Sequence, residues 1–443
     1  MTLLVLGLNH RTAPVAVRER FAWTGAQAAE ARNALARLDG VRESAWLGTC
    51  NRSEIYAVVD PYHVGLESIL DFLSRWGDMP LSELRPLLYS YRDHEAARHL
   101  FRVACGLDAM VVGEGEILGQ VRQAYTQAQT AGTVDKLLHQ LFSEALRVGK
   151  RARTETAIGQ HALSVSGVAV QWAKDLFPDL ENRVVMIVGA GETAEGVLRS
   201  LQAAGARAVV VANRTAGRAL ALAEEYGGRA IGLDELPAYI PAADIIISST
   251  SSRGWILTRD MLARALQASG RWGEGPDPAG KGGLYIIDLA VPRDVDPAAA
   301  QLPGVRLVDI DQISVAVNGN LRARQLEIPQ VEAIIQDEVK HFGHWLSTQE
   351  VVPVIRSLRT MAYEIREAEL RRIFNKIPDL DERQRQIIET ATAAMINKVL
   401  SHPTALLREW AGQDEGRWYA KAVSELFNLP AGDQEPPQAP KVG

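Results

Sequence analysis

The stretch RVVMIVGAGETAEGVLRSLQAAGARAVVVANRT, residues 183–215, predicts the fold of the middle of this chain. It reads as an apolar strand, a glycine turn, a helix and a second apolar strand. Gly189-x-Gly191-x-x-Ala194 follows the first strand directly. Gly189 permits a tight turn, Gly191 lets the backbone approach a pyrophosphate, and Ala194 lets the helix pack closely on the strand. The stretch therefore predicts a dinucleotide-binding unit, with a ligand-free tight turn as the alternative.

The end of the second strand bears on which dinucleotide is bound. An NAD-binding unit carries an acidic residue there, about 20 positions after the first glycine, to bind the ribose 2′-hydroxyl. This chain has Asn213, Arg214 and Thr215 instead. No carboxylate repels a 2′-phosphate and an arginine can bind one, so the sequence favours NADPH. An exposed loop arginine without a ligand is the alternative.

The segments on either side extend this unit into domains. Strands expected at 229–231, 243–252, 284–295 and 305–313 alternate with helices, which predicts a doubly wound parallel sheet. Upstream, an α+β module is expected, with strands at 3–10 and 53–59, helices at 26–38 and 94–107, and a loop at 108–120 before a helix from Val121.

The C-terminal part reads as helical. From Val315 to about Ser347 there are few helix breakers, and Pro329 is expected to kink one long helix. Further helices are expected after Pro353, over 354–377, 381–400 and near 418–427. The proline-rich polar tail is expected to be disordered.

Composition limits the class of protein. With 443 residues, 47% hydrophobic and 23% charged, the chain fits a globular protein of two to four domains without an apolar run that could span a membrane. The net charge of −6 argues against a whole-surface attraction to nucleic acid and leaves local basic patches such as 147–153 open. Only two cysteines, Cys50 and Cys105, indicate a cytoplasmic protein with free thiols.

Cys50 lies in the polar run LGTCNRSEIY, residues 47–56. Buried cysteines usually have apolar neighbours, as Cys105 does. Arg52 could favour the Cys50 thiolate or bind a substrate carboxylate. A thiol nucleophile combined with NADPH suggests attack on an activated acyl group, followed by reduction of the thioester to an aldehyde. A purely structural Cys50 is the alternative.

Several motifs together resemble the glutamyl-tRNA reductases, which catalyse the first step of the five-carbon route to tetrapyrroles. They are GLNHRTAPV (7–15), TCNRSEIY (49–56), GLDAMVVGEGEILGQVR (106–122), VGAGETA (188–194), ANRT (212–215), DLAVPRDV (288–295) and NKVLSHPTALLRE (397–409). The resemblance implies reduction of glutamyl-tRNA(Glu) by NADPH to glutamate 1-semialdehyde through a cysteine thioester. It also implies a cytoplasmic, V-shaped homodimer, with glutamate-1-semialdehyde aminomutase as a possible partner and no membrane contact.

The resemblance also implies a division into domains. These are a catalytic domain (1–155), a Rossmann-like NADPH domain (156–314), a long spinal helix (315–350), a helical dimerisation domain (351–428) and a disordered tail (429–443). An NADP dehydrogenase acting on a small alcohol, and a dimeric RNA-binding or redox-sensing module, are the rival interpretations.

Site residues follow from the same resemblance. Cys50 falls on the family's nucleophile and His99 on a histidine important for activity. The alternative for His99 is a structural helix histidine that is hydrogen-bonded to the backbone. The implied substrate-binding residues are Thr49, Asn51, Arg52, Ala109, Glu114, Gly115, Glu116 and Gln120. The implied cofactor-binding residues are Gly189, Ala190, Gly191, Glu192, Thr193, Ala194, Asn213, Arg214 and Thr215.

Two positions depart from the family pattern, which usually has serine where this chain has Gly48 and Ala109. The second departure removes a hydroxyl from the substrate loop and bears on substrate affinity more than on the fold. His341 and His344 have a spacing that could hold a metal, but no third ligand is evident, so no metal site is expected.

Overall fold

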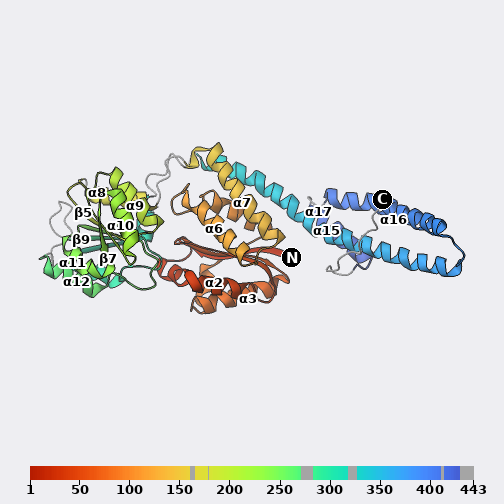
Figure 1. Ribbon diagram of the computed structural model, residues 1–443, viewed down its shortest axis with the longest axis horizontal. Coiled ribbons are helices and arrows are strands. Elements are labelled where there is room, and N and C mark those ends of the chain that lie inside the picture. Colours follow the sequence, from red (N-terminus) through yellow and green to blue (C-terminus); the bar gives the residue numbers. More distant parts are fainter. Residues whose placement is uncertain (160–164, 178, 271–282, 318–326, 411–413, 430–443) are drawn as a thin grey trace. The chain divides into compact units, whose positions relative to one another are not determined.

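The structure, a computed structural model, describes residues 1–159, 165–177, 179–270, 283–317, 327–410 and 414–429 (Figure 1). It divides into two units, Met1–Gln336 and Asp337–Gly443. The first unit contains two sheets, one formed by residues before 93 and the other by residues after 183. The second unit is helical.

The N-terminal sheet is antiparallel, with the strand order β2-β3-β1-β4. Helices cover both of its faces, α2 and α3 on one side and α6 and α7 on the other (Figure 1). Every residue of β3 is buried as a consequence. The bounds are β1 (Thr2–Asn9), β2 (Val41–Gly48), β3 (Arg52–Val59), β4 (Tyr89–Arg92), α2 (Gly25–Leu35), α3 (Tyr62–Trp76), α5 (Asp93–Ala104), α6 (Glu116–Thr130) and α7 (Lys136–Glu155).

The expected strands and helices of this module are confirmed, with one shift. The helix expected from Val121 is α6, which begins at Glu116. Its first residues had been assigned to the loop, because Gly113 and Gly115 suggest irregular backbone. Gly113 does have a left-handed φ of 84°, but the helix starts directly after Gly115.

The second sheet is entirely parallel, with the order β10-β9-β8-β5-β6-β7. This confirms the doubly wound fold and places the reversal of strand order between β5 and β8, where such sheets bind ligands. The bounds are β5 (Val184–Val188), β6 (Ala208–Asn213), β7 (Arg229–Gly232), β8 (Ile245–Ser248), β9 (Leu284–Asp288) and β10 (Val305–Asp309).

Two apolar cores lie on the two faces of this sheet. Val185 and Ile187 of β5 pack with α8 (Val165–Leu176), α9 (Glu192–Ala203) and α10 (Ala216–Tyr226). Met186 and Val188 point to the other face and pack with α11 (Leu236–Tyr239) and α12 (Arg259–Ala268). The alternation follows from the two-residue period of a strand and explains why β5 is apolar throughout.

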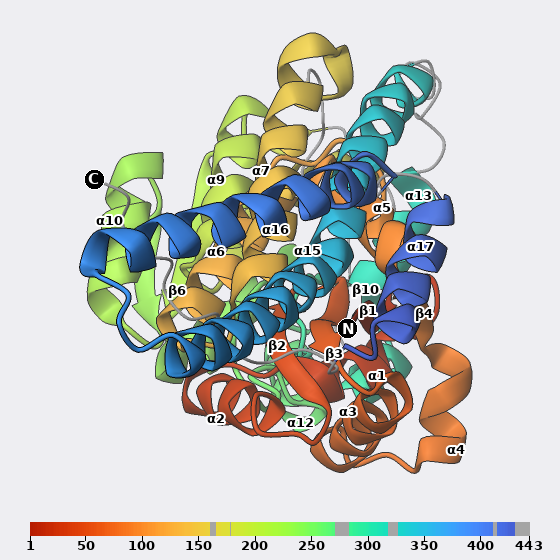
Figure 2. The ribbon, with the colours of Figure 1, turned by 90° about the vertical axis from the view of Figure 1, so that its right-hand side faces the viewer.

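The second unit contains most of one very long helix, α15 (Ile328–Lys376), together with α16 (Glu382–Trp410) and α17 (Asp414–Leu426). Figure 2 shows α15 and α16 side by side. The separate helix expected after Pro353 is a wrong prediction, because α15 continues through Pro353. Pro329 does not kink a helix either: it is in the first turn of α15, where a missing backbone N–H costs nothing. Pro403 likewise lies inside α16.

Some predictions fall outside the described residues. These are the tail after Leu429 and the part of the spinal helix at 318–326, so the domain limits given above stay predictions. No helix in the described part of the chain is both long and apolar enough to cross a membrane.

Candidate active site

Cys50 occupies the tip of the tight hairpin between β2 and β3. The hydroxyl of Thr49 accepts hydrogen bonds from the backbone N–H groups of Asn51 (3.1 Å) and Arg52 (3.2 Å), and the Thr49 N–H donates to the carbonyl of Arg52 (2.8 Å). The Asn51 carbonyl accepts from the N–H of His10 (2.9 Å). The threonine thus closes the turn locally and leaves the Cys50 side chain at its apex, half-buried and reduced.

Arg18 joins this hairpin to the nucleotide domain. Its guanidinium donates to the carbonyl of Cys50, to the carbonyl of Ala13 (3.2 Å) and to the carboxylate of Asp311. Asp311 also accepts from the backbone N–H of Val15 (2.9 Å). Because Arg18 is 3% exposed, its charge is held in place between the two domains and beside the thiol.

A second ion pair spans the same boundary. Arg293, which follows β9, donates to Glu19 through Nε (3.0 Å) and Nη2 (2.8 Å). Cys50 itself packs against an apolar cluster that contains residues of both domains, among them Val15 and Met110 of the first and Ile287 and Leu289 of the second. The thiol therefore lies where the two domains of the first unit meet.

The electrostatics at Cys50 differ from the sequence-based expectation. Burial raises the pKa of the thiol to about 12, the Glu114 carboxylate adds to the rise, and Arg18 opposes it. Arg18, not Arg52, is therefore the cation that favours the thiolate. Glu114 is 5% exposed, and burial together with Glu116 raises its pKa to about 7. Its Oε2 is buried without a hydrogen-bond partner among the described residues.

Arg52 belongs to a buried cluster centred on Glu54. Its Nη1 donates to Glu54 (2.6 Å) and Asp108 (3.1 Å), and its Nη2 donates to the Asp108 carbonyl. Both terminal nitrogens are thus occupied by groups of the protein. The Nε–H, which is buried without an acceptor among the described residues, and the second hydrogen of Nη2 are the donors left for a substrate carboxylate.

His99 lies in the same cluster. Its Nε2 is 2.9 Å from Glu54 Oε1, and its ring stacks on Tyr91 with centroids 4.9 Å apart. The hydroxyls of Tyr56 (2.5 Å) and Tyr89 also donate to Glu54. Glu54 is 0% exposed. His99 is therefore positioned through Glu54, and the structure gives it no hydrogen bond to Cys50.

The other residues implied to bind substrate line up along the loop before α6 and its first turns. Ala109 is half-buried beside Asp108, whose carboxylate accepts from Asn9 (3.2 Å) and Arg11. Gly115 is exposed and immediately precedes α6, while Glu116 and Gln120 are half-buried on that helix. Arg153 donates to the Glu114 carbonyl (3.0 Å) and fixes the loop to α7.

The glycine turn opens a cavity of ≈ 400 Å³ at the reversal of strand order. Gly189 has a φ of 122°, and a Cβ on it would lie 2.7 Å from the Ser249 carbonyl, so the turn requires glycine. Asp294 fixes the opposite wall, accepting from the Ser248 hydroxyl (2.6 Å) and the Thr250 N–H (2.7 Å). Of the implied cofactor residues, the cavity is lined by Gly189, Ala190, Gly191, Thr193, Asn213, Arg214 and Thr215.

Two implied cofactor residues are not in this lining. Ala194 is fully buried in the core, as its expected packing role requires, and Glu192 lies in the first turn of α9. Arg218 and Ser249–Ser252 line the cavity and were missed. The polar end of the strand in ADIIISSTSS and the arginine three positions after Thr215 were the available signals.

The basic run at 147–153 is largely neutralised within its own helix. Arg147 pairs with Glu144, Arg151 pairs with Glu155 (2.9 Å), and Arg153 donates to backbone carbonyls. On α15, the ligand atoms of Asp337, Glu338 and His341 lie within 4.8 Å of one another. These partners of His341 were not predicted from the sequence; His344 is not in the group, and exposed acidic groups often gather without an ion.

Comparison with known proteins gives a consistent picture. The model of the glutamyl-tRNAGlu reductase N-terminal domain matches residues 6–156, that of shikimate / quinate 5-dehydrogenase matches 171–316, and that of the glutamyl-tRNAGlu reductase dimerisation domain matches 330–429. The glutamyl-tRNA reductase of Paenibacillus macerans is 40% identical, over 97% of this chain and 96% of its own length. That of Moorella thermoacetica is 41% identical, over 97% and 95%. The solved glutamyl-tRNA reductase of Methanopyrus kandleri is 31% identical, with a TM-score of 0.52, over 96% of this chain and 99% of its own.

Proposed function

Because this chain belongs to the glutamyl-tRNA reductase family, we propose that Cys50 is the nucleophile with which it takes the glutamyl group from tRNA. The reaction of the family reduces that group to glutamate 1-semialdehyde, the first step of tetrapyrrole synthesis from glutamate. One observation carries the assignment to Cys50: of the two free thiols, it alone lies at the boundary between the substrate domain and the nucleotide domain. Cys105 is fully buried.

The proposed acyl transfer replaces one bond of the ester carbonyl carbon by another. Cys50 Sγ bonds to the ester carbonyl carbon, the bond from that carbon to the ribose oxygen breaks, and the thiol proton ends on the ribose hydroxyl. Because burial keeps this thiol protonated at neutral pH, a proton acceptor is needed. Glu114, with a pKa raised to about 7 and a free buried oxygen, is suited to carry that proton.

Arg18 has a supporting role in this scheme. It binds the carbonyl of Cys50 and, through Asp311, the nucleotide domain, so the contact between the two domains and the placement of the thiol are coupled. The substrate-binding set is proposed to be Thr49, Asn51, Arg52, Ala109, Glu114, Gly115, Glu116 and Gln120, with His99 acting through Glu54.

The cavity at the glycine turn suits NADPH. When bound there, the nicotinamide supplies the hydride that reduces the thioester to the aldehyde and frees Cys50. Bare backbone at Gly191 and the N-terminus of α9 suit a pyrophosphate, since nothing lies within 4 Å of a Cβ built on Gly191. Asn213, Arg214 and Arg218 line the same cavity and suit a 2′-phosphate, which supports NADPH over NADH.

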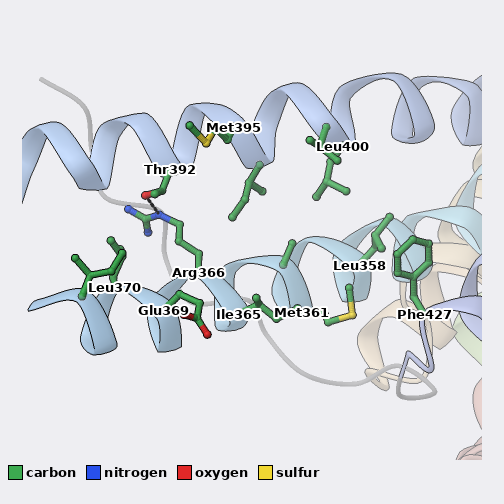
Figure 3. A pocket seen from close by; sticks show the side chains of 14 residues that line it. Leu358, Met361, Ile365, Arg366, Glu369, Leu370, Thr392, Met395, Leu400 and Phe427 are labelled. Atoms are coloured by element: carbon green, nitrogen blue, oxygen red, sulfur yellow. Dashed lines mark hydrogen bonds between the residues drawn. The ribbon is translucent and has the colours of Figure 1, made fainter. Parts of the chain in front are cut away.

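The helical unit is proposed to form a homodimer. An apolar groove of ≈ 390 Å³ runs between α15 and α16, and its lining includes Leu358, Ile365, Met395 and Leu400 (Figure 3). Met395 and Val399 are 64% and 71% exposed in the single chain. A second copy would remove this surface from water. A cytoplasmic location and an association with the aminomutase that consumes the aldehyde complete the proposal.

The decisive comparison is between the two cysteines. Cys50→Ser should abolish NADPH oxidation by glutamyl-tRNA, because a serine hydroxyl is a far weaker nucleophile than a thiol at neutral pH. Cys105→Ala, in the core, should retain most of it. Appreciable turnover by Cys50→Ser would remove the thioester mechanism.

A further inference from the structure

A cavity separate from the cofactor site adjoins the hairpin that carries Cys50. It measures ≈ 340 Å³ and lies at the edge strand β2, where α2 and α6 meet around the sheet. Both helices contribute to its wall, and Arg32 of α2 donates to Gln127 of α6 (3.1 Å) across it. Gly48, two residues before Cys50, and Gln120 also line it.

One wall of this cavity is aromatic. The indoles of Trp23 and Trp46 have centroids 5.1 Å apart, and Trp46 Nε1 donates to the Ser53 hydroxyl (2.9 Å). Trp23 Nε1 is buried without a partner among the described residues. A Cβ on Gly48 would lie 2.2 Å from the Trp46 ring, so Trp46 occupies the space of the serine that the family usually has there. Glycine at 48 therefore leaves room for the Trp46 ring in the cavity wall, two residues along the chain from Cys50.

The opposite wall is polar and cationic. Gln120, Gln123 and Gln127 follow one another at spacings of three and four residues, which places them on one face of α6. Arg32 is half-buried, and Gln127 is the partner it has among the described residues, with no carboxylate near enough to form an ion pair. The cavity thus combines two indole rings, three amides and a guanidinium that has no counter-ion among the described residues.

We infer that this cavity binds the 3′-terminal nucleotide of the tRNA, the leaving group of the acyl transfer. The inference rests on the proposed reaction at Cys50. A base stacks on indole rings, and glutamine amides bind base edges in single-stranded RNA ends. A guanidinium binds the 5′-phosphate. The position follows from the chemistry, because the ester carbon at Cys50 is joined directly to the ribose of this nucleotide.

The test compares uncharged tRNA(Glu) that ends in its terminal adenosine with the same tRNA lacking that nucleotide. Filter binding to the full-length protein gives a ratio of the two dissociation constants. The wild type should bind the intact tRNA roughly fivefold to 150-fold more tightly, the range for stacking of one base. Gln123→Ala and Arg32→Gln should each shrink that ratio roughly threefold to tenfold by weakening only the intact tRNA.

Arg122→Gln is the matched control, since Arg122 is an exposed cation on the same helix and does not line the cavity. It should lower both affinities equally or not at all. A wild-type ratio near one, or ratios in Gln123→Ala and Arg32→Gln equal to that of the control, would overturn the inference. Binding of uncharged tRNA needs no thioester, so failure of Cys50 as the nucleophile would show in the turnover of Cys50→Ser and leave these ratios as they are.

Discussion

Glu54→Gln tests whether the buried cluster beneath the active site depends on one carboxylate. Although burial pushes its pKa upward, Arg52 and His99 hold the pKa of Glu54 well below its usual range, so it is ionised in the folded protein. The amide keeps the shape of the side chain and removes the charge. Arg52 would retain Asp108 as its remaining acidic partner, and its Nε is already buried without an acceptor among the described residues.

The size of the effect follows from this burial. Removing one partner of a buried ion pair costs about 3–5 kcal/mol, because the remaining charge stays desolvated. Each kcal/mol shifts the midpoint of a domain of this size by about 2–4 °C. We therefore expect the thermal transition of the N-terminal domain to fall by about 6–20 °C in Glu54→Gln.

Scanning calorimetry of the variant against the wild type measures this directly. Glu95→Gln is the matched control, because Glu95 makes an exposed ion pair with Arg98 on α5 and should shift the transition by less than about 2 °C. The two variants differ in burial and not in chemistry. A Glu54→Gln transition within 2 °C of that of the control would contradict this expectation and show that the cluster does not need the charge.

Three further changes test other parts of the site. Arg214→Ala should lower the ratio of kcat/KM for NADPH to that for NADH, whereas exposed Arg207→Ala should not; an unchanged ratio in Arg214→Ala would assign the specificity to other residues. Burial raises the pKa of Glu114 from 4.5 to about 7, so between these values the folded state holds more protons than the unfolded state. The free energy of unfolding, and with it Tm, should therefore fall as the pH rises from 4.5 to about 7. In Glu114→Gln this fall in Tm should be smaller. An equal fall in both proteins would contradict a raised pKa at Glu114. Ala109→Ser should restore one hydrogen bond to the substrate and lower KM for glutamyl-tRNA roughly threefold to tenfold at little change in kcat; an equal or higher KM would mean that the site has adapted to alanine.

The parts of the structure that local rules determine could be predicted from the sequence. The strand, glycine turn and helix at 183–215 are contiguous in the chain, and the φ of Gly189 is of the kind that glycine adopts readily. The two-residue period of β3 could also have placed Arg52, Glu54 and Tyr56 on one face, where the structure finds them hydrogen-bonded.

Contacts between distant segments could not be predicted in this way. Arg18 reaches Cys50 and Asp311 across separations of 32 and 293 residues, and no spacing in the sequence links them. The separate helix expected after Pro353 was a wrong prediction for a different reason. Its local penalty of about 3 kcal/mol predicts a break, but Val351 and Ile355 beside it are buried in the core of the helical unit, and their packing keeps α15 continuous.

In the proposed mechanism, Cys50 carries the glutamyl group before that group is reduced. Incubating the enzyme with glutamyl-tRNA in the absence of NADPH, followed by acid quenching and mass spectrometry of its peptides, tests this most directly. We expect a mass increase of one glutamyl group on the peptide containing Cys50, released by hydroxylamine and absent from Cys50→Ser. A glutamyl group on another residue, or an unmodified Cys50 in an enzyme that turns over once NADPH is added, would contradict it.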